Sequence, residues 1–477
     1  MNSFHSTKRA ANSGAYFGLQ YECCSFIIYG KDRLFMPTKI DFIGGNTKRC
    51  LMAMALPMIA AMFLNMMYNL VDSLWIGNLL GKTAYAALTN STPIILILTS
   101  VAMGATNGVS LLISQAIGAK DKKKAESLIA TSFCVAVTFS LLVTILLEIF
   151  LPGILKALNT PAETYDMAYS YLAIYILGYL AVYLYLYFTA VLRSFGNSMF
   201  QAVAMLVSTI LNAVFDPVFI HFIGFHGAAI ATLLSQMICL LFMLIYLKKK
   251  KLFTFKISAF NSNDALLLIQ KAIPSVIQQS IPAISTTSLT ALVSTYSVTA
   301  IAAYGVTGKL ETILFYPAMA LNMVLTTIIG QCAGGARYDR AKDYLKCALG
   351  YGCGLLVILS VLVVGFSKQL SGLFVRSSDV AVIVGTYFLI VSIGYVLNTV
   401  TNCYLGALNG MGKPSKSMFL MIFYYIVVRI PLAYLLSYLG FGLNGIWVAV
   451  LVSHIVASLA ATMTGTVLIR KKGNIKA

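Results

Sequence analysis

Residues 112–126 read LISQAIGAKDKKKAE, and a second copy of this pattern, IIGQCAGGARYDRAK, occupies residues 328–342. Gln115 in the first copy matches Gln331 in the second. The same offset in numbering relates Gly118 to Gly334, Ala125 to Ala341 and Gly196 to Gly412. Further matches along the chain have slightly longer offsets, which short insertions explain. We therefore infer that the chain consists of two copies of one unit.

Each copy contains six apolar runs long enough to cross a bilayer, which takes about 20 residues. Of the 477 residues, 59% are hydrophobic and only 10% are charged, whereas soluble proteins have about 25% charged residues. The mean hydropathy is +0.85. We therefore predict an all-α polytopic membrane protein with twelve transmembrane helices. The predicted spans are 51–77, 87–117, 126–151, 164–190, 198–220, 226–247, 267–295, 302–331, 343–366, 380–408, 417–439 and 444–469.

Six spans per copy is an even number, so both copies enter the membrane from the same side. The two halves are then expected to form six-helix lobes related by a pseudo-twofold axis along the membrane normal. The resulting domains are an N-terminal cytoplasmic arm that need not be ordered (1–49), an N-terminal lobe (50–247), a basic cytoplasmic linker (248–266), a C-terminal lobe (267–470) and a cytoplasmic tail (471–477).

The net charge is +19, and the distribution of the basic residues indicates how the chain is oriented in the membrane. Of the 34 Lys and Arg residues, 28 fall before the first span or in connections on the same side as the N-terminus. Basic residues concentrate on the cytoplasmic side of membrane proteins, so we predict that both termini are cytoplasmic and that the chain lies in the cell membrane. This distribution argues against a nucleic-acid partner. The other six bases are Lys82, Lys156, Lys368 and Arg376 on the opposite side, and Lys309 and Arg429 within spans.

Asp216 lies in LNAVFDPVFI (211–220), a nearly continuous apolar run. An ionised Asp at the centre of a transmembrane helix costs about 2.5–3.5 kcal/mol, which favours a functional role. Asn212 precedes it by one helical turn, on the same helix face, and can donate a hydrogen bond to the carboxylate. Pro217 cannot donate to the carbonyl one turn earlier, so that oxygen is free as well. These groups could hold a proton or Na⁺; the alternative is an acid that only fixes helix packing.

Asp72 shows the same pattern in the first span. Asn65, Tyr68, Asn69 and Asp72 have helical spacing and share one face. The second copy has Leu289 where the first has Asp72, so the two halves differ at this carboxylate.

The fourth span contains a tyrosine at every fourth position. The middle three, Tyr175, Tyr179 and Tyr183, are candidates for a cavity that binds flat cations through cation–π contacts. Helix packing is the alternative. Tyr171 and Tyr187, at the two ends, suit interfacial aromatic belts better.

Other polar residues in the spans allow looser predictions. Lys309 and Glu311 are separated by one residue, do not face each other on a helix, and either could border a cavity. Arg429 could pair across helices or orient a substrate anion. His454 corresponds to Gln236 in the repeat, which suggests a polar packing position.

Sequence motifs of enzymes are not visible. The chain lacks the P-loop pattern GxxxxGK[ST], and its nine cysteines show no CxxC or Cys/His metal spacing. We therefore expect no catalytic activity, no cofactor and no transition-metal site.

Several stretches resemble the multidrug and toxic compound extrusion (MATE) family, within the multidrug/oligosaccharidyl-lipid/polysaccharide flippase superfamily. They are ALPMIAAMFLNMMYNLVDSLWIGNLLG, SQAIGAKDKKKAE, RSFGNS with LNAVFDPVFI and GAAIAT, and LNGMGKPS with RIPLAYLL and GFGLNGIW. The resemblance covers residues 50 to 470. It implies two lobes around a central cavity and cation-coupled export of amphiphilic, often cationic, compounds.

The resemblance also implies a coupling site. Tyr68, Asp72, Asn212 and Asp216 match first-lobe coupling residues of the family, and Asn69 lies on the same face as Asp72. Some branches carry acids in spans seven and ten, but this sequence has none there, which resembles the branch related to the DNA-damage-inducible protein F. The implied site would take H⁺ or, at Asp72, Asp216 and Asn212, Na⁺.

We therefore predict a monomeric secondary antiporter that exports organic cations or drugs in exchange for H⁺ or Na⁺, with Pro57 and Pro217 as hinges. A flippase for a lipid-linked oligosaccharide precursor is one alternative, although its diphosphate calls for a more cationic cavity. A channel is the alternative from another class.

Overall fold

The computed structural model describes residues 40–158, 160–250, 259–375 and 377–474. Most of the predicted N-terminal arm and part of the predicted linker therefore lie outside the described residues, as do the last three residues of the tail. Asp41–Ala477 forms one compact unit by itself.

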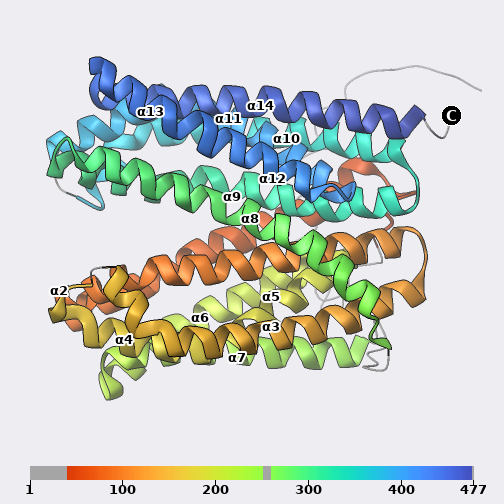
Figure 1. Cartoon of the computed structure of the whole chain (residues 1–477), viewed down its shortest axis with the longest axis horizontal. Helices are drawn as coiled ribbons and strands as arrows, with labels where there is room; N and C mark the ends of the chain where they lie inside the picture. Colours follow the sequence, from red (N-terminus) through yellow and green to blue (C-terminus); the bar gives the residue numbers. More distant parts are fainter. Residues whose placement is uncertain (1–39, 159, 251–258, 376, 475–477) are drawn as a thin grey trace, which may run out of the picture. The chain divides into compact units, whose positions relative to one another are not determined.

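The described chain is helical. The first half contains α2 (Thr47–Gly118), α3 (Lys122–Ala157), α4 (Ala162–Leu177), α5 (Tyr179–Ser194), α6 (Met199–Ile223) and α7 (Phe225–Lys250). The second half contains α8 (Ser262–Ser294), α9 (Val298–Gly334), α10 (Tyr338–Gly372), α11 (Ser378–Gly410), α12 (Pro414–Ile422), η2 (Phe423–Arg429), α13 (Ile430–Leu436), η3 (Ser437–Phe441) and α14 (Gly442–Asn474). In Figure 1 the helices α2 to α7 gather in one bundle, and α9 to α14 gather in a second one.

These helices account for twelve spans. Nine described helices are long and apolar enough to cross a membrane, and the bent pair α4 and α5 makes a tenth. The run Pro414–Lys471 counts once among the nine but contains two spans, which part at Gly440 and Gly442, both with positive φ. The remaining span is α8, which is less apolar than the other spans because it contains the stretch QQSIPAISTTS. The prediction of twelve helices in two lobes is confirmed.

Two glycines interrupt helices. One lies between two predicted spans, and the other lies within a single predicted span. Gly81 has φ 82° and divides α2 into its two spans, Thr47–Gly81 and Thr83–Gly118. Gly178 separates α4 from α5, which are bent by 48°. A Cβ at Gly178 would lie 2.2 Å from the side chain of Leu233 on α7, so a larger residue there would force that side chain to move. The predicted span over 164–190 is thus present, but it is bent at Gly178.

The repeated motif of residues 112–126 and 328–342 forms a reciprocal contact between the lobes. The side-chain amide of Gln115 donates to the carbonyl of Gly410 (2.9 Å), and that of Gln331 donates to the carbonyl of Ser194 (2.7 Å). A Cβ on Gly118 would lie 1.9 Å from the Gln331 carbonyl oxygen. A Cβ on Gly334 would lie 1.9 Å from that of Gln115. The pseudo-twofold relation is thus visible in atomic contacts, and only glycine permits them.

Candidate functional site

Asp216 is fully buried on α6, on the same helix face as Ser208 and Asn212. The side-chain amide of Asn212 donates to Asp216 Oδ1 over 2.9 Å, as the spacing of one helical turn predicts. Asp216 Oδ2 and Asn212 Oδ1 are also buried and have no hydrogen-bond partner. The carboxylate is therefore held by one donor and keeps an acceptor free.

Asp72 is 8% exposed and lies on the first span of α2. Its Oδ1 is buried and lacks a hydrogen-bond partner. Asp72 and Asp216 are close enough for their charges to interact, and α2 packs directly on α6 through Ala61 and Met205. The structure thus brings together two carboxylates from the first and fifth spans, which are far apart in the sequence.

Tyr68 connects this region to α7 and does not bond to either acid. Its hydroxyl donates to the Thr232 carbonyl (3.4 Å) and shares a hydrogen bond with Ser235 Oγ (3.3 Å). The Thr232 hydroxyl is buried and unpaired, and Gln236, one turn further along α7, has an unpaired buried Oε1. Sequence reasoning missed this contribution of α7, although Ser235 and Gln236 lie in a stretch that the repeat analysis had aligned.

Asn69 does not join this set. It is exposed, and its amide donates to the Asn65 carbonyl of its own helix over 2.7 Å. Helical spacing placed Asn69 near the face of Asp72, but adjacent positions on a helix point about 100° apart, and only Tyr68 and Asp72 turn inward.

The site therefore contains an excess of acceptors over donors. Buried polar atoms in proteins are nearly always hydrogen-bonded, so unpaired ones need an explanation. Here the unpaired atoms are all oxygens: Asp72 Oδ1, Asp216 Oδ2, Asn212 Oδ1, Thr232 Oγ1 and Gln236 Oε1. A proton shared by Asp72 and Asp216, or a small cation bound between them, would give their unpaired oxygens a partner.

The three candidate cavity tyrosines lie in the hydrophobic core of the first lobe. Tyr175, Tyr179 and Tyr183 are at most 5% exposed. The Tyr179 hydroxyl donates to the Leu98 carbonyl (3.1 Å), and its ring meets that of Tyr183 edge-on at 5.9 Å. These contacts correspond to the packing alternative, and a role in substrate binding stays a prediction.

The outer tyrosines of the same stretch are not interfacial. Tyr171 is 2% exposed, and its ring contacts Phe225 at 5.2 Å. Tyr187 is fully buried, and its hydroxyl donates to the Ile129 carbonyl over 2.7 Å. The belt assignment is wrong because both rings face other helices. Tyr171 lies near enough to Asp72 and Asp216 for electrostatic interaction, a position that its sequence spacing did not reveal.

The predicted hinge prolines both lie inside helices that continue past them. Pro57 lies in the first span of α2 and Pro217 in α6. The non-helical backbone conformation in α2 is at Gly81 instead. A hinge role for the prolines stays a prediction.

The second lobe has its own polar cluster, centred on Arg429. This side chain is 6% exposed at the end of η2, a π-helical segment. It donates to Ser453 Oγ (2.9 Å) and to the Tyr424 hydroxyl (3.0 Å), and it lies 3.1 Å from His454 Nε2. The rings of Tyr424 and Tyr425 flank its guanidinium at 4.9 and 4.5 Å.

Glu311 on α9 is the acid of this second cluster. Its Oε1 accepts hydrogen bonds from the hydroxyls of Tyr387 (2.5 Å) and Tyr395 (2.8 Å), both on α11. Glu311 is close enough to Arg429 for their charges to attract, although they form no direct ion pair. Ser453 and Ser235 occupy matching repeat positions, in LVSH and LLSQ. The two clusters therefore share the equivalent fifth and sixth spans of their lobes, whereas Asp72 lies on the first span of its lobe and Glu311 on the second span of its own.

Comparison with known proteins covers most of the chain. The family model described as MatE matches residues 57–218 and 274–435. The probable multidrug resistance protein YpnP of Bacillus subtilis is 28% identical over 88% of this chain and 95% of its own length. A FAD transporter of Shewanella oneidensis is 26% identical over 86% and 93%, respectively.

Solved structures share the fold. One is an outward-facing conformation of a multidrug resistance MATE family transporter, with a TM-score of 0.87 and 22% sequence identity over 92% of this chain and 99% of that one. Another, from Pyrococcus furiosus, is described as a multidrug/oligosaccharidyl-lipid/polysaccharide (MOP) superfamily transporter whose binding pocket has reverse polarity; it has the same TM-score, identity and coverage.

Proposed function

The chain belongs to the MatE family of multi-pass membrane transporters, and from this premise we propose that it is a secondary antiporter that exports amphiphilic organic cations or drugs in exchange for H⁺ or Na⁺. As a member of this family it is a transporter and not an enzyme. The multidrug resistance and export proteins among its relatives support a small-molecule cargo.

One observation carries the coupling assignment. Two buried carboxylates, Asp72 and Asp216, come from different helices and each keeps an unpaired oxygen. Low dielectric disfavours the ionised form of both, and two neighbouring negative charges disfavour it further. A proton or Na⁺ from outside removes one negative charge from the pair, and the less negative site holds an organic cation less well. Release of the cargo outward and of the ion inward then completes one exchange.

Efflux of ethidium from vesicles containing the purified protein tests this proposal. An imposed gradient of pH or of Na⁺ drives efflux if the chain is an antiporter, and the effective gradient identifies the ion. A cation gradient directed opposite to the movement of ethidium stimulates ethidium transport by an antiporter but not through a channel. Passive, gradient-independent leakage of ethidium contradicts the proposal.

A flavin dinucleotide is the second candidate cargo. The relative from Shewanella oneidensis is called a FAD transporter, and Arg429 gives the second lobe a buried positive charge. The same vesicle assay with FAD in place of ethidium separates the two cargoes, because each is followed by its own fluorescence.

The proposed orientation has both termini in the cytoplasm. A reporter enzyme fused after Ala477 is expected to be active only on the cytoplasmic side. Activity outside the cell contradicts an even number of spans.

A further inference from the structure

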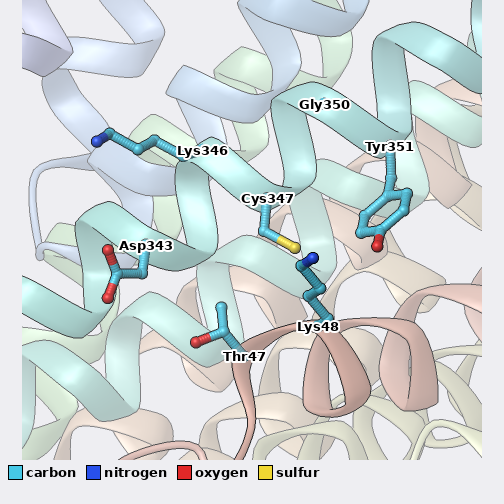
Figure 2. Close-up of a pocket in the computed structure, with 7 residues that line it drawn as sticks. All are labelled: Thr47, Lys48, Asp343, Lys346, Cys347, Gly350 and Tyr351. Carbon is cyan, nitrogen blue, oxygen red and sulfur yellow. The ribbon is translucent and has the colours of Figure 1, made fainter. Parts of the chain in front are cut away.

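A groove of about 540 Å³ lies where the first helix of one lobe meets the third span of the other. Its residues on α2 are Thr47 and Lys48, and those on α10 are Asp343, Lys346, Cys347, Gly350 and Tyr351. Figure 2 shows Lys48 extending from α2 toward Cys347, with Tyr351 on one side of Cys347 and Lys346 on the other, where the Lys346 side chain extends away from Lys48. The groove thus has one lysine from each lobe.

The charges in this groove have no internal ion-pair partners. Within the described residues, ion pairs join Lys124 to Asp264 and Arg337 to Asp339. Neither pair includes a residue that lines the groove. Asp343 is the one acid in the lining, against two lysines, so the groove has a net positive charge.

The pseudo-equivalent junction, between α3 and α8, is closed. The offset that relates Gln115 to Gln331 also relates Lys48 to Asp264. There Asp264 is 3% exposed and accepts hydrogen bonds from Lys124 and, over 2.7 Å, from Ser127. Thr131, which is equivalent to Cys347, is fully buried and accepts from the Asn261 backbone over 3.0 Å. By the same offset Ser127 corresponds to Asp343, so in the groove the acid lies on α10, a lysine takes the position of Asp264 on α2, and the described residues show no ion pair between them.

The groove also has the polarity gradient of a membrane interface. Asp343 lies near the start of α10, and Tyr351 follows it by a little over two helical turns, or about 12 Å along the axis. Tyrosine is enriched at the level of lipid headgroups. A Cβ on Gly350 would meet nothing within 4 Å, so space remains beside the helix there. The charged end of the groove lies on the side that the distribution of bases marks as cytoplasmic.

We propose that this groove binds the headgroup of an anionic phospholipid, with its phosphate between Lys48 and Lys346. The cytoplasmic leaflet is rich in anionic lipids, and basic pockets between transmembrane helices bind such headgroups. The phosphate supplies the negative charge that one acid against two lysines leaves unbalanced in the groove. Because the two lysines belong to different lobes, the bound lipid holds α2 and α10 together at this end.

Native mass spectrometry of the full-length protein tests this site. After purification with phosphatidylglycerol or phosphatidylcholine, the wild type is expected to retain phosphatidylglycerol selectively. The double variant Lys48→Gln/Lys346→Gln should lose about tenfold or more of that affinity, since each base near the surface contributes appreciably to anionic lipid binding. Lys122→Gln/Lys123→Gln on α3 is the matched control and should retain it.

Three results would overturn the proposal. Equal loss in the control variant would mean general surface attraction. Undiminished phosphatidylglycerol binding in the groove variant would exclude the two lysines. Competition by soluble glycerol phosphate at concentrations similar to those of the lipid would make the site one for a free anion. If the charge variant does not fold, Gly350→Trp fills the groove without changing its charge and should cause the same loss.

Discussion

Each lobe carries a buried polar cluster, and the two clusters differ in how completely their charges are satisfied. In the first lobe, Asp216 receives one hydrogen bond from Asn212, and oxygens of both Asp72 and Asp216 remain unpaired. In the second lobe, Glu311 receives two tyrosine hydroxyls, and Arg429 has three polar neighbours and two flanking rings. Burial of a charge therefore does not distinguish the two clusters; the unpaired carboxylate oxygens do, and the proposed coupling site rests on them.

The largest effect is expected from neutralising the first-lobe acids. Asp216→Asn and Asp72→Asn should each abolish gradient-driven efflux, because the scheme requires a group that exchanges its charge. The protein should still insert, since an amide is less costly in the membrane than a carboxylate. Ethidium efflux from vesicles with equal protein content is the measurement. Wild-type efflux by Asp216→Asn under an imposed gradient would show that this acid is structural.

The next largest effect is expected on stability, from Arg429→Met. Removing one charge of a buried, mutually compensating set typically costs about 3–5 kcal/mol, because the other charge is left uncompensated. Thermal unfolding in detergent should therefore shift to markedly lower temperature. Efflux per folded molecule should still depend on the ion gradient. If the Arg429→Met protein is stable but its efflux no longer depends on the ion gradient, the coupling site lies in the second lobe and not in the first.

A smaller effect is expected from Asn212→Ala. This change removes the hydrogen bond to Asp216, and hydrogen bonds to charged groups contribute about 1.5–3 kcal/mol. The ion concentration that gives half-maximal efflux should rise by about tenfold, with residual transport at saturation. Asn69→Ala is the control, because Asn69 bonds only within its own helix. An equal shift in both variants would mean that the Asn212 bond has no special role.

The smallest effects are expected from a matched pair of serines, Ser235→Ala and Ser453→Ala. Each loses the bond that its hydroxyl donates to a carbonyl of its own helix. Each also loses a second bond, worth about 1 kcal/mol for the tyrosine hydroxyl at Ser235 and somewhat more for the charged donor at Ser453. Ser453→Ala should therefore lower the unfolding temperature more than Ser235→Ala. The opposite order would show that the first-lobe cluster is the more important one for stability.

The fold was predictable because a bilayer imposes strong and local rules on sequence. Twelve apolar runs, the repeated motif with Gln115 and Gln331, and the charge distribution together predict two six-helix lobes. The sequence pattern did not reveal where a span bends. The helices α4 and α5 are bent by 48° at Gly178, and no periodicity within 164–190 contains that information.

The candidate site was only partly predictable. The spacing of Asn212 and Asp216 determined their hydrogen bond, because residues one turn apart on a helix face one way. The same rule included Asn69, which the structure leaves exposed, and it assigned Tyr171 and Tyr187 to the interface although both are buried. Helical spacing shows which side chains share a helix face. It does not show whether that face contacts lipid or another helix.

The sequence by itself determined the class of molecule, its internal duplication and the identity of its rare intramembrane charges, since hydropathy, repetition and residue type are properties of the chain. Only the tertiary structure decided which of those charges are satisfied. Tyr387, Tyr395 and Tyr424 resemble the other tyrosines of the sequence until packing brings their hydroxyls to Glu311 and Arg429. Hydrogen bonding depends on atoms within about 3 Å of each other, and residues far apart in the chain reach that distance only when the helices pack.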